Sequence, residues 1–250
     1  MPVTWQPVGT GDLDALAKAR LEAINLVQWL VRIANSFVTA NTSEEPTELE
    51  FRAVGAAFVT KPFEGNLALE MRLPTLEMQF LENGRPMPHI LDPEEHSPAE
   101  VEAWLLVELL HRGIDHTRFS KKLPYIIPGL LTGDEKDYSP QLCQQGLTQL
   151  MVWFQNAAAI LDATARASGR NGGRIICRPQ TLDLSYVSNR GSGSADFGFS
   201  PGDAQSPEPF FYGNARAPNG KECSVLPASK LFEEDDPCAA AITFMQAATG

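Results

Sequence analysis

The sequence predicts an α+β protein with an antiparallel sheet and long helices packed on one face of that sheet. Apolar residues recur at three- and four-residue steps over two long stretches of the chain, which predicts two long amphipathic helices. Each stretch is followed by short segments of alternating or β-rich residues. The order long helix, three strands, helix then occurs twice, which predicts two pseudo-repeated helix–three-strand–helix units.

The first unit begins with a helix over residues 13–37, for which Asp12 is the expected N-cap. Three strand candidates follow at residues 49–60, 66–72 and 75–81. Prolines, glycines and the pair Asn83-Gly84 break the chain around them. Antiparallel strands joined by short turns are therefore expected in this part.

A capping box marks the helix that closes the first unit. Ser97 and Glu100 have the spacing of that motif, and Pro98 stands at the first helical position. Gly113 is expected to end the helix. Residues 114–133 then form a connector.

The second unit repeats this order. A long helix is expected after Ser139-Pro140, strands at residues 174–187, 195–199 and 209–215, and a last helix from Asp236-Pro237. We expect one domain over residues 1–250, with pseudo-repeat halves of about 1–133 and 134–250.

Composition excludes several classes of protein. The chain has 250 residues, 43% of them hydrophobic and 20% charged, which is typical of a globular protein. Its formal net charge is −11 and both halves are acidic, so nucleic acid and anionic membranes are not expected as partners. Neither a secretory signal nor a membrane-length apolar stretch is visible, which predicts a soluble cytoplasmic protein with free cysteines. The oligomeric state is left open.

Common catalytic and cofactor motifs are absent from the sequence. It contains no G-x-S-x-G, no P-loop and no G-x-G-x-x-G after a strand, so no cofactor is expected. The four histidines lack zinc-protease spacing. His111 and the pair Asp115-His116 could approach one another at the helix exit, but the sequence indicates no third ligand, so no metal site is expected.

Asp183 is the main candidate for a functional carboxylate. It stands between Leu182 and Leu184, so alternation places its side chain with Ser185 on the face opposite both leucines. Arg178 and Arg216 are nearby arginines that could pair with this carboxylate or with the carboxylate of a ligand. A structural Asp–Arg pair and a ligand site are both compatible with this pattern.

Aromatic residues on the neighbouring strands could pack in the core or line a pocket. The candidates for ligand contact are Phe199, Phe210 and Tyr212. The first functional hypothesis is a small-molecule binding or accessory protein, with its pocket between residues 175–187, residues 210–215 and the long helices. The alternatives are a cofactor-independent hydrolase, isomerase or cyclase with Asp183 as acid or base, and a structural or interaction protein.

The chain from Gly113 onward also resembles a bacterial family of unknown function. The likeness rests on Gly113-Ile114-Asp115, on Leu182-Asp183-Leu184, on the turn Gly198-Phe199-Ser200-Pro201-Gly202 and on Phe210-Phe211-Tyr212. Family members tend to carry histidine or aromatic residues just before the aspartate, where this chain has Ile176-Cys177-Arg178-Pro179. The resemblance implies a single fold and a site near Asp183, and it implies no activity.

Overall fold

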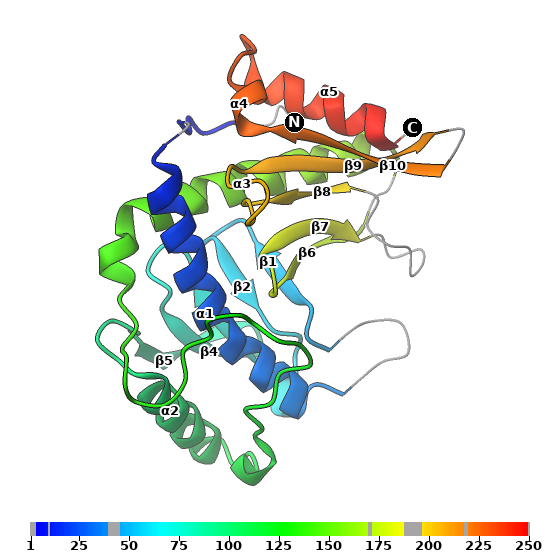
Figure 1. Ribbon diagram of the computed structural model, residues 1–250. Coiled ribbons are helices and arrows are strands. Elements are labelled where there is room, and N and C mark those ends of the chain that lie inside the picture. Colours follow the sequence, from blue (N-terminus) through cyan, green and yellow to red (C-terminus); the bar gives the residue numbers. More distant parts are fainter. Residues whose placement is uncertain are drawn as a thin grey trace.

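A ten-stranded antiparallel sheet covered by helices confirms the α+β class (Figure 1). The computed structural model describes residues 4–9, 11–39, 46–169, 172–187, 197–217 and 220–249, with backbone alone at 214–217, 220–222 and 249. The helices are α1 Leu13–Phe37, α2 Pro98–His111, α3 Gln144–Ala167, α4 Ala228–Leu231 and α5 Pro237–Thr249, with 3-10 turns η1 Glu64–Asn66, η2 His116–Arg118 and η3 Pro140–Cys143. The strands are β1 Leu49–Arg52, β2 Ala57–Val59, β3 Leu67–Arg72, β4 Met78–Glu82, β5 Arg85–Leu91, β6 Arg174–Arg178, β7 Asp183–Val187, β8 Phe197–Ser200, β9 Phe210–Ala217 and β10 Gly220–Pro227.

The strand order of the sheet is symmetric about its centre. It runs β10-β9-β8-β7-β6-β1-β2-β3-β4-β5, so the first strand of each half pairs with the first strand of the other. At this junction Leu49 lies opposite Cys177 and Glu50 opposite Ile176. The two halves therefore share one continuous sheet, and α2 and α5 lie toward its opposite ends (Figure 1). An origin of the halves by repetition stays a prediction.

The described residues of each half form five strands, so the prediction of three strands per half was wrong in number. The expected strand 49–60 is the hairpin β1–β2, and the expected strand 174–187 is the hairpin β6–β7. Ala56 and Leu182, in the turns of these hairpins, have φ of 48° and 62°, which a continuous strand does not allow. The last strand of each half, β5 or β10, was missed.

The reason for missing β5 lies in its prolines and in the turn before it. Pro86 and Pro88 cannot donate to a ladder, and β5 is an edge strand, where proline is tolerated. Asn83 and Gly84 have φ of 51° and 75° and form the two-residue turn that joins β4 to β5. The pair is thus a hairpin signal that joins two strands, and the expectation of a break in the strand pattern at this point was incomplete.

Helix starts follow the sequence signals closely. The Asp12 side chain accepts hydrogen bonds from the backbone N–H groups of Asp14 and Ala15 at the start of α1. The Ser97–Glu100 capping box is present at the start of α2. Ser139-Pro140 opens η3, from which α3 continues at Gln144, so the expected helix begins with a 3-10 turn.

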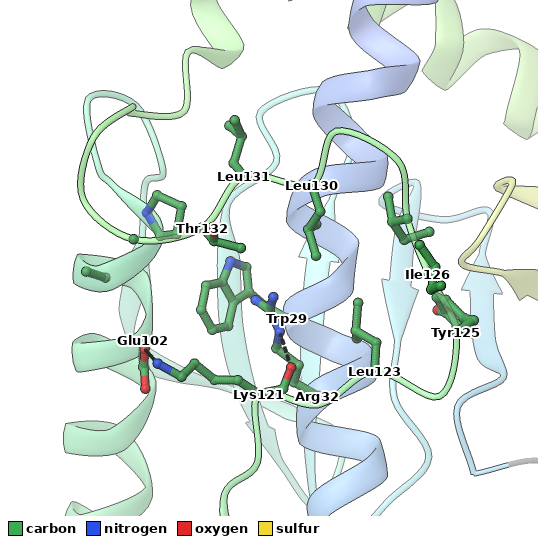
Figure 2. Close-up of a pocket in the computed structure, with 14 residues that line it drawn as sticks. Trp29, Arg32, Glu102, Lys121, Leu123, Tyr125, Ile126, Leu130, Leu131 and Thr132 are labelled. Atoms are coloured by element: carbon green, nitrogen blue, oxygen red, sulfur yellow. Dashed lines mark hydrogen bonds and ion pairs between the residues drawn. The ribbon is translucent and has the colours of Figure 1, made fainter.

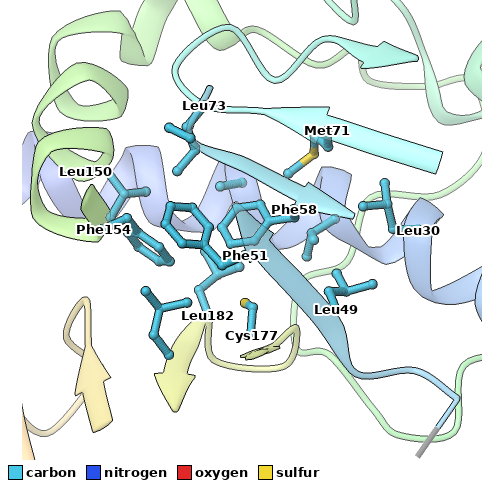
Figure 3. Close-up of a cluster of buried hydrophobic side chains, with 14 of the residues drawn as sticks. Leu30, Leu49, Phe51, Phe58, Met71, Leu73, Leu150, Phe154, Cys177 and Leu182 are labelled. Carbon is cyan, nitrogen blue, oxygen red and sulfur yellow. The ribbon is translucent and has the colours of Figure 1, made fainter. Parts of the chain in front are cut away.

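The core lies between the sheet and the long helices α1 and α3. A Cβ atom on Gly146 would lie 2.3 Å from the Ala15 carbonyl oxygen, so glycine at this position lets the two helices approach closely. At the junction of the halves, the rings of Phe51, Phe58 and Phe154 have pairwise centroid distances of 5.4 Å (Figure 3). Residues from both halves therefore pack in one core.

Two further features concern the cysteines and the hydropathy of the helices. The four cysteines are free thiols, as expected, and Cys177 is the one that is fully buried. Within the described parts of the chain, no helix is both long enough and apolar enough to cross a membrane.

Candidate ligand-binding site

Strand β7 places Asp183 and Ser185 on the sheet face opposite the long helices, in agreement with the predicted alternation. Leu184 stands between them and is fully buried in the core. Ser185 is also fully buried, and its hydroxyl lies 3.1 Å from the Tyr212 hydroxyl of β9. The structure thus brings three of the predicted site residues onto one face.

Tyr212 reaches Ser185 across Gly198 of the intervening strand β8. Gly198 lies opposite Ser185 on one side and opposite Tyr212 on the other. A Cβ atom on Gly198 would lie 2.3 Å from the Tyr212 hydroxyl oxygen and 2.4 Å from the Leu184 carbonyl oxygen. The absence of a side chain at this position lets the tyrosine ring lie over the strand, and burial raises the pKa of Tyr212.

Asp183 is held in a setting that disfavours its charge. Burial raises the pKa of Asp183, and hydrogen bonds with Ser200 and Thr181 and the charge of Arg178 oppose this effect only in part. Its Oδ1 atom is buried and has no hydrogen-bond partner. Arg178 lies opposite Asp183 in the β6–β7 register, but its side chain is exposed, and it acts on Asp183 through its charge without an ion pair between these two described residues.

The remaining predicted contact residues are dispersed. Phe210 is half-buried, and its ring centroid lies 6.3 Å from that of Tyr212. Phe199 lies on the helix-covered face, where its ring stacks on Trp153 at 5.9 Å between centroids, so it does not join Asp183. The Arg216 side chain lies outside the described residues.

A cavity of about 490 Å³ lies between α1, the first turns of α2 and the connector 121–133 (Figure 2). We call it the Trp29 cavity. Asp183, Ser185 and Tyr212 do not line it, and they do not line a second cavity of about 580 Å³ near Arg178, Pro179 and Glu48. The Trp29 cavity is therefore separate from the location that the sequence predicted.

The connector is attached to α1 by a row of polar side chains at helical spacing, which we call the polar stripe: Asn25, Gln28, Arg32 and Asn35. The Asn25 Oδ1 atom accepts from the Leu131 backbone N–H at 2.8 Å, and the Gln28 Oε1 atom accepts from the Tyr125 hydroxyl at 3.0 Å. Arg32 and Asn35 donate to the backbone carbonyls of Lys121 and Lys122 at 3.2 and 3.3 Å. The stripe therefore fixes the connector along the helix, and Arg32 is the member of the stripe that lines the cavity.

The floor of the cavity is the indole of Trp29. This side chain is 1% exposed, and its Nε1–H donates to the Tyr138 hydroxyl at 3.0 Å. Both groups are fixed by this bond, and burial raises the pKa of Tyr138 to about 12. Leu123 and Leu130 of the connector add apolar surface beside the ring (Figure 2).

Arg32 is the charged group inside the cavity. The residue is 4% exposed, and its guanidinium carbon lies 4.1 Å from the centroid of the Trp29 ring. Only Nε has an acceptor, the Lys121 carbonyl oxygen, so the two terminal nitrogens have no hydrogen-bond or ion-pair partner among the described residues. Burial lowers the pKa of Arg32, and the charges of Tyr138 and Glu102 oppose that effect.

The rim of the cavity carries an ion pair. Lys121 Nζ lies 3.0 Å from Glu102 Oε2, where α2 faces the connector (Figure 2). The lining residues include no histidine, cysteine or serine, and the Tyr125 hydroxyl is held by Gln28. This arrangement can bind an anion and an apolar body, and it lacks a base–nucleophile pair.

The sequence contains a signal for this site in the polar residues of the first long helix. Asn25 and Gln28 interrupt the most apolar stretch of the chain, and with Arg32 and Asn35 they recur at steps of three and four residues. Polar residues at that spacing on a buried helix must meet hydrogen-bonding partners. Those partners are backbone and side-chain groups of the connector.

Comparisons of the chain with protein-family profiles, with curated proteins and with solved structures find no match. The resemblance to a bacterial family therefore stays a prediction, and the geometry of the chain alone carries the functional argument.

Proposed function

We propose that this protein binds a small amphiphilic molecule with a carboxylate or a similar planar anionic group in the Trp29 cavity. The observation that carries the proposal is Arg32, which is 4% exposed and has two terminal nitrogens without an acceptor in the described structure. A guanidinium that is largely removed from water and forms no ion pair with a described carboxylate would gain from an anionic ligand that completes its hydrogen bonds.

The chemistry of the anion follows from the guanidinium group. An arginine offers parallel N–H donors that fit a carboxylate in a bidentate arrangement, and it remains charged throughout the physiological pH range. Because Nε is already bonded to the Lys121 carbonyl, the two terminal nitrogens are the donors left for the ligand. A single planar anionic group therefore suits this part of the cavity.

The body of the ligand follows from the other walls. Trp29, Leu123 and Leu130 present flat or apolar surface to the cavity, and its volume of about 490 Å³ lies in the ordinary range for a small-molecule site. An apolar or aromatic body next to the anionic group would replace water against these side chains. Binding without chemistry is the function that this combination supports best.

Native mass spectrometry of freshly purified protein tests the proposal. We expect a bound anionic amphiphile that is released on denaturation and is not retained by the Arg32→Met variant. Arg166→Met is the matched control, because Arg166 is exposed on α3 and pairs with Asp162. A bound molecule that is neutral, or one that Arg32→Met retains equally well, would contradict the proposal.

Acid or base chemistry at Asp183 is a second candidate function. It is favoured by the buried Oδ1 atom without a partner and by the raised pKa of this carboxyl group. Neither described cavity borders Asp183, so this candidate has less support than binding in the Trp29 cavity. The Asp183→Asn variant tests it below.

A further inference from the structure

Three metal-ligating side chains meet where the end of α2 lies against the edge strand β5. Glu108 and His111 are three residues apart on α2 and project to the same side of the helix. His89 comes from β5, which the sequence analysis did not predict. The three residues offer donor atoms that all lie within 4.8 Å of one another.

The distances within this cluster are close to those of a coordination sphere. His89 Nδ1 lies 2.9 Å from Glu108 Oε1, and His111 Nδ1 lies 3.9 Å from the same oxygen. Ligand atoms of a tetrahedral zinc ion at bond lengths of about 2.0–2.1 Å are about 3.4 Å apart. Small side-chain rotations would bring both imidazoles and the carboxylate around one ion.

The carboxylate is oriented by a neighbour outside the cluster. Arg112 Nη1 donates to Glu108 Oε2 at 2.6 Å, and the Arg112 guanidinium carbon lies 4.7 Å from the centroid of the Phe80 ring. One oxygen of Glu108 is thereby occupied, and the other, Oε1, is directed toward both histidines. Such outer hydrogen bonds hold the ligands of metal sites in orientation.

The cluster is buried on the side of Glu108 and open to solvent on the side of the two histidines. The side chain of Glu108 is 4% exposed, whereas those of His89 and His111 are 63% and 60% exposed. The carboxylate forms the base, and the imidazoles reach the solvent from which an ion would arrive. Water could complete the coordination.

We propose that His89, Glu108 and His111 form a binding site for a divalent transition-metal ion of the zinc type, with solvent water as the remaining ligand. Imidazole nitrogen with one carboxylate oxygen is a donor set that suits zinc and its neighbours in the first transition row. The site lies at the C-terminal end of α2, whereas the first turn of the same helix lines the Trp29 cavity. The proposal is independent of the proposed function.

Isothermal titration calorimetry with ZnCl₂ on tag-free protein tests this site. Every protein carries Cys223→Ser, because the exposed Cys223 thiol could itself bind zinc. We expect saturable binding of one zinc ion per chain, and His89→Ala and His111→Ala should each weaken it about tenfold or more. His116→Ala is the matched control, since His116 is exposed on η2, outside the cluster, and it should bind as the parent does.

Cobalt(II) gives a second readout that identifies the ligands. The parent protein should show visible d–d absorption without a thiolate-to-cobalt charge-transfer band, and His111→Ala should lose this spectrum. His111→Ala leaves the His89–Glu108 and Arg112–Glu108 bonds in place, so its fold should persist, and circular dichroism checks this. No saturable zinc binding by the parent, or equal binding by His111→Ala, would overturn the proposal and leave the cluster as a hydrogen-bonded contact between β5 and α2.

Discussion

The Arg32 guanidinium carbon lies 4.1 Å from the centroid of the Trp29 ring, which comes from the preceding turn of α1. The Trp29 indole is fixed by its hydrogen bond to the Tyr138 hydroxyl. It contacts the Arg32 cation, with which no described carboxylate forms an ion pair. A cation–π contact of this kind compensates for only part of the desolvation of a buried charge. On the proposed function, an anionic ligand would supply the interaction that this cation lacks.

Replacement of Arg32 by methionine should separate stability from binding. The variant loses a hydrogen bond to Lys121 and the contact with Trp29, but it also loses the cost of burying a charge. We expect the free energy of unfolding to change by less than about 1.5 kcal/mol. Urea unfolding measures this change. A much larger loss of stability would identify Arg32 as a structural residue of α1.

The polar stripe should contribute to stability through the connector. Gln28 accepts from the Tyr125 hydroxyl and donates to the Pro179 carbonyl at 2.8 Å, so Gln28→Leu leaves both partners without their bonds. We expect a loss of about 1–3 kcal/mol. Tyr125→Phe removes one of these partners, so a double-mutant cycle of the two changes should show coupling between them. Additive effects would contradict the proposed attachment of the connector.

Asp183→Asn should alter the pH dependence of stability. The folded-state pKa of Asp183 is raised by burial, so the folded protein binds a proton more readily than the unfolded chain does. The stabilising contribution of Asp183 is therefore fully present below its ordinary pKa of 3.8. This contribution falls as the pH rises through the raised folded-state pKa, and it stays low at higher pH. The variant, which cannot ionise, should be at least as stable as the parent at pH 7, and this difference should shrink toward acid pH.

Thermal melts from pH 3.5 to 7.5 check this sign, and Asp162→Asn is the control. Asp162 forms an exposed pair with Arg166 at 2.8 Å, so its replacement should cost about 0.3–0.5 kcal/mol. We also expect Asp183→Asn to leave binding in the Trp29 cavity unchanged. Loss of binding in an Asp183→Asn variant that folds normally would move the ligand site to Asp183, as acid or base chemistry at that residue requires.

Gly198→Ala should disturb the face that carries Tyr212. The added Cβ would meet the Leu184 carbonyl oxygen at 2.4 Å, and a backbone atom cannot move aside as a flexible side chain can. We expect a loss of about 1–3 kcal/mol, together with displacement of the Tyr212 ring. Gly9→Ala is the comparison, because the nearest atom to its Cβ lies at 3.8 Å. Equal stability of the two variants in urea would disprove the close contact.

Much of the fold could be predicted from local chemistry. Asp12 and the Ser97–Glu100 box identified the starts of α1 and α2 because capping depends on residues next to one another in the chain. Strand number was harder to predict. Two short strands joined by a tight turn, as in β6–β7 around Pro179, give the same run of apolar residues as one longer strand.

The candidate site was harder to predict, because it depends on contacts between distant segments. Alternation correctly placed Asp183 and Ser185 on one face, yet it could not show that the walls of the Trp29 cavity come from α1, α2 and the connector. Arg32 and Lys121 are 89 positions apart, and His89 and Glu108 come from different elements. Only the spacing of the polar stripe carried this information along the chain.

The central claim is that Arg32 selects a planar anion in the Trp29 cavity, and the affinity ratio of a matched ligand pair tests it most directly. 2-Naphthoate and 2-naphthamide have nearly the same shape and differ in charge, and isothermal titration calorimetry can measure both against the parent protein and Arg32→Met. We expect the parent to prefer the naphthoate by about tenfold or more, and Arg32→Met to lose that preference while Arg166→Met keeps it. Equal affinity of the parent for the two compounds, or an unchanged preference in Arg32→Met, would contradict the account.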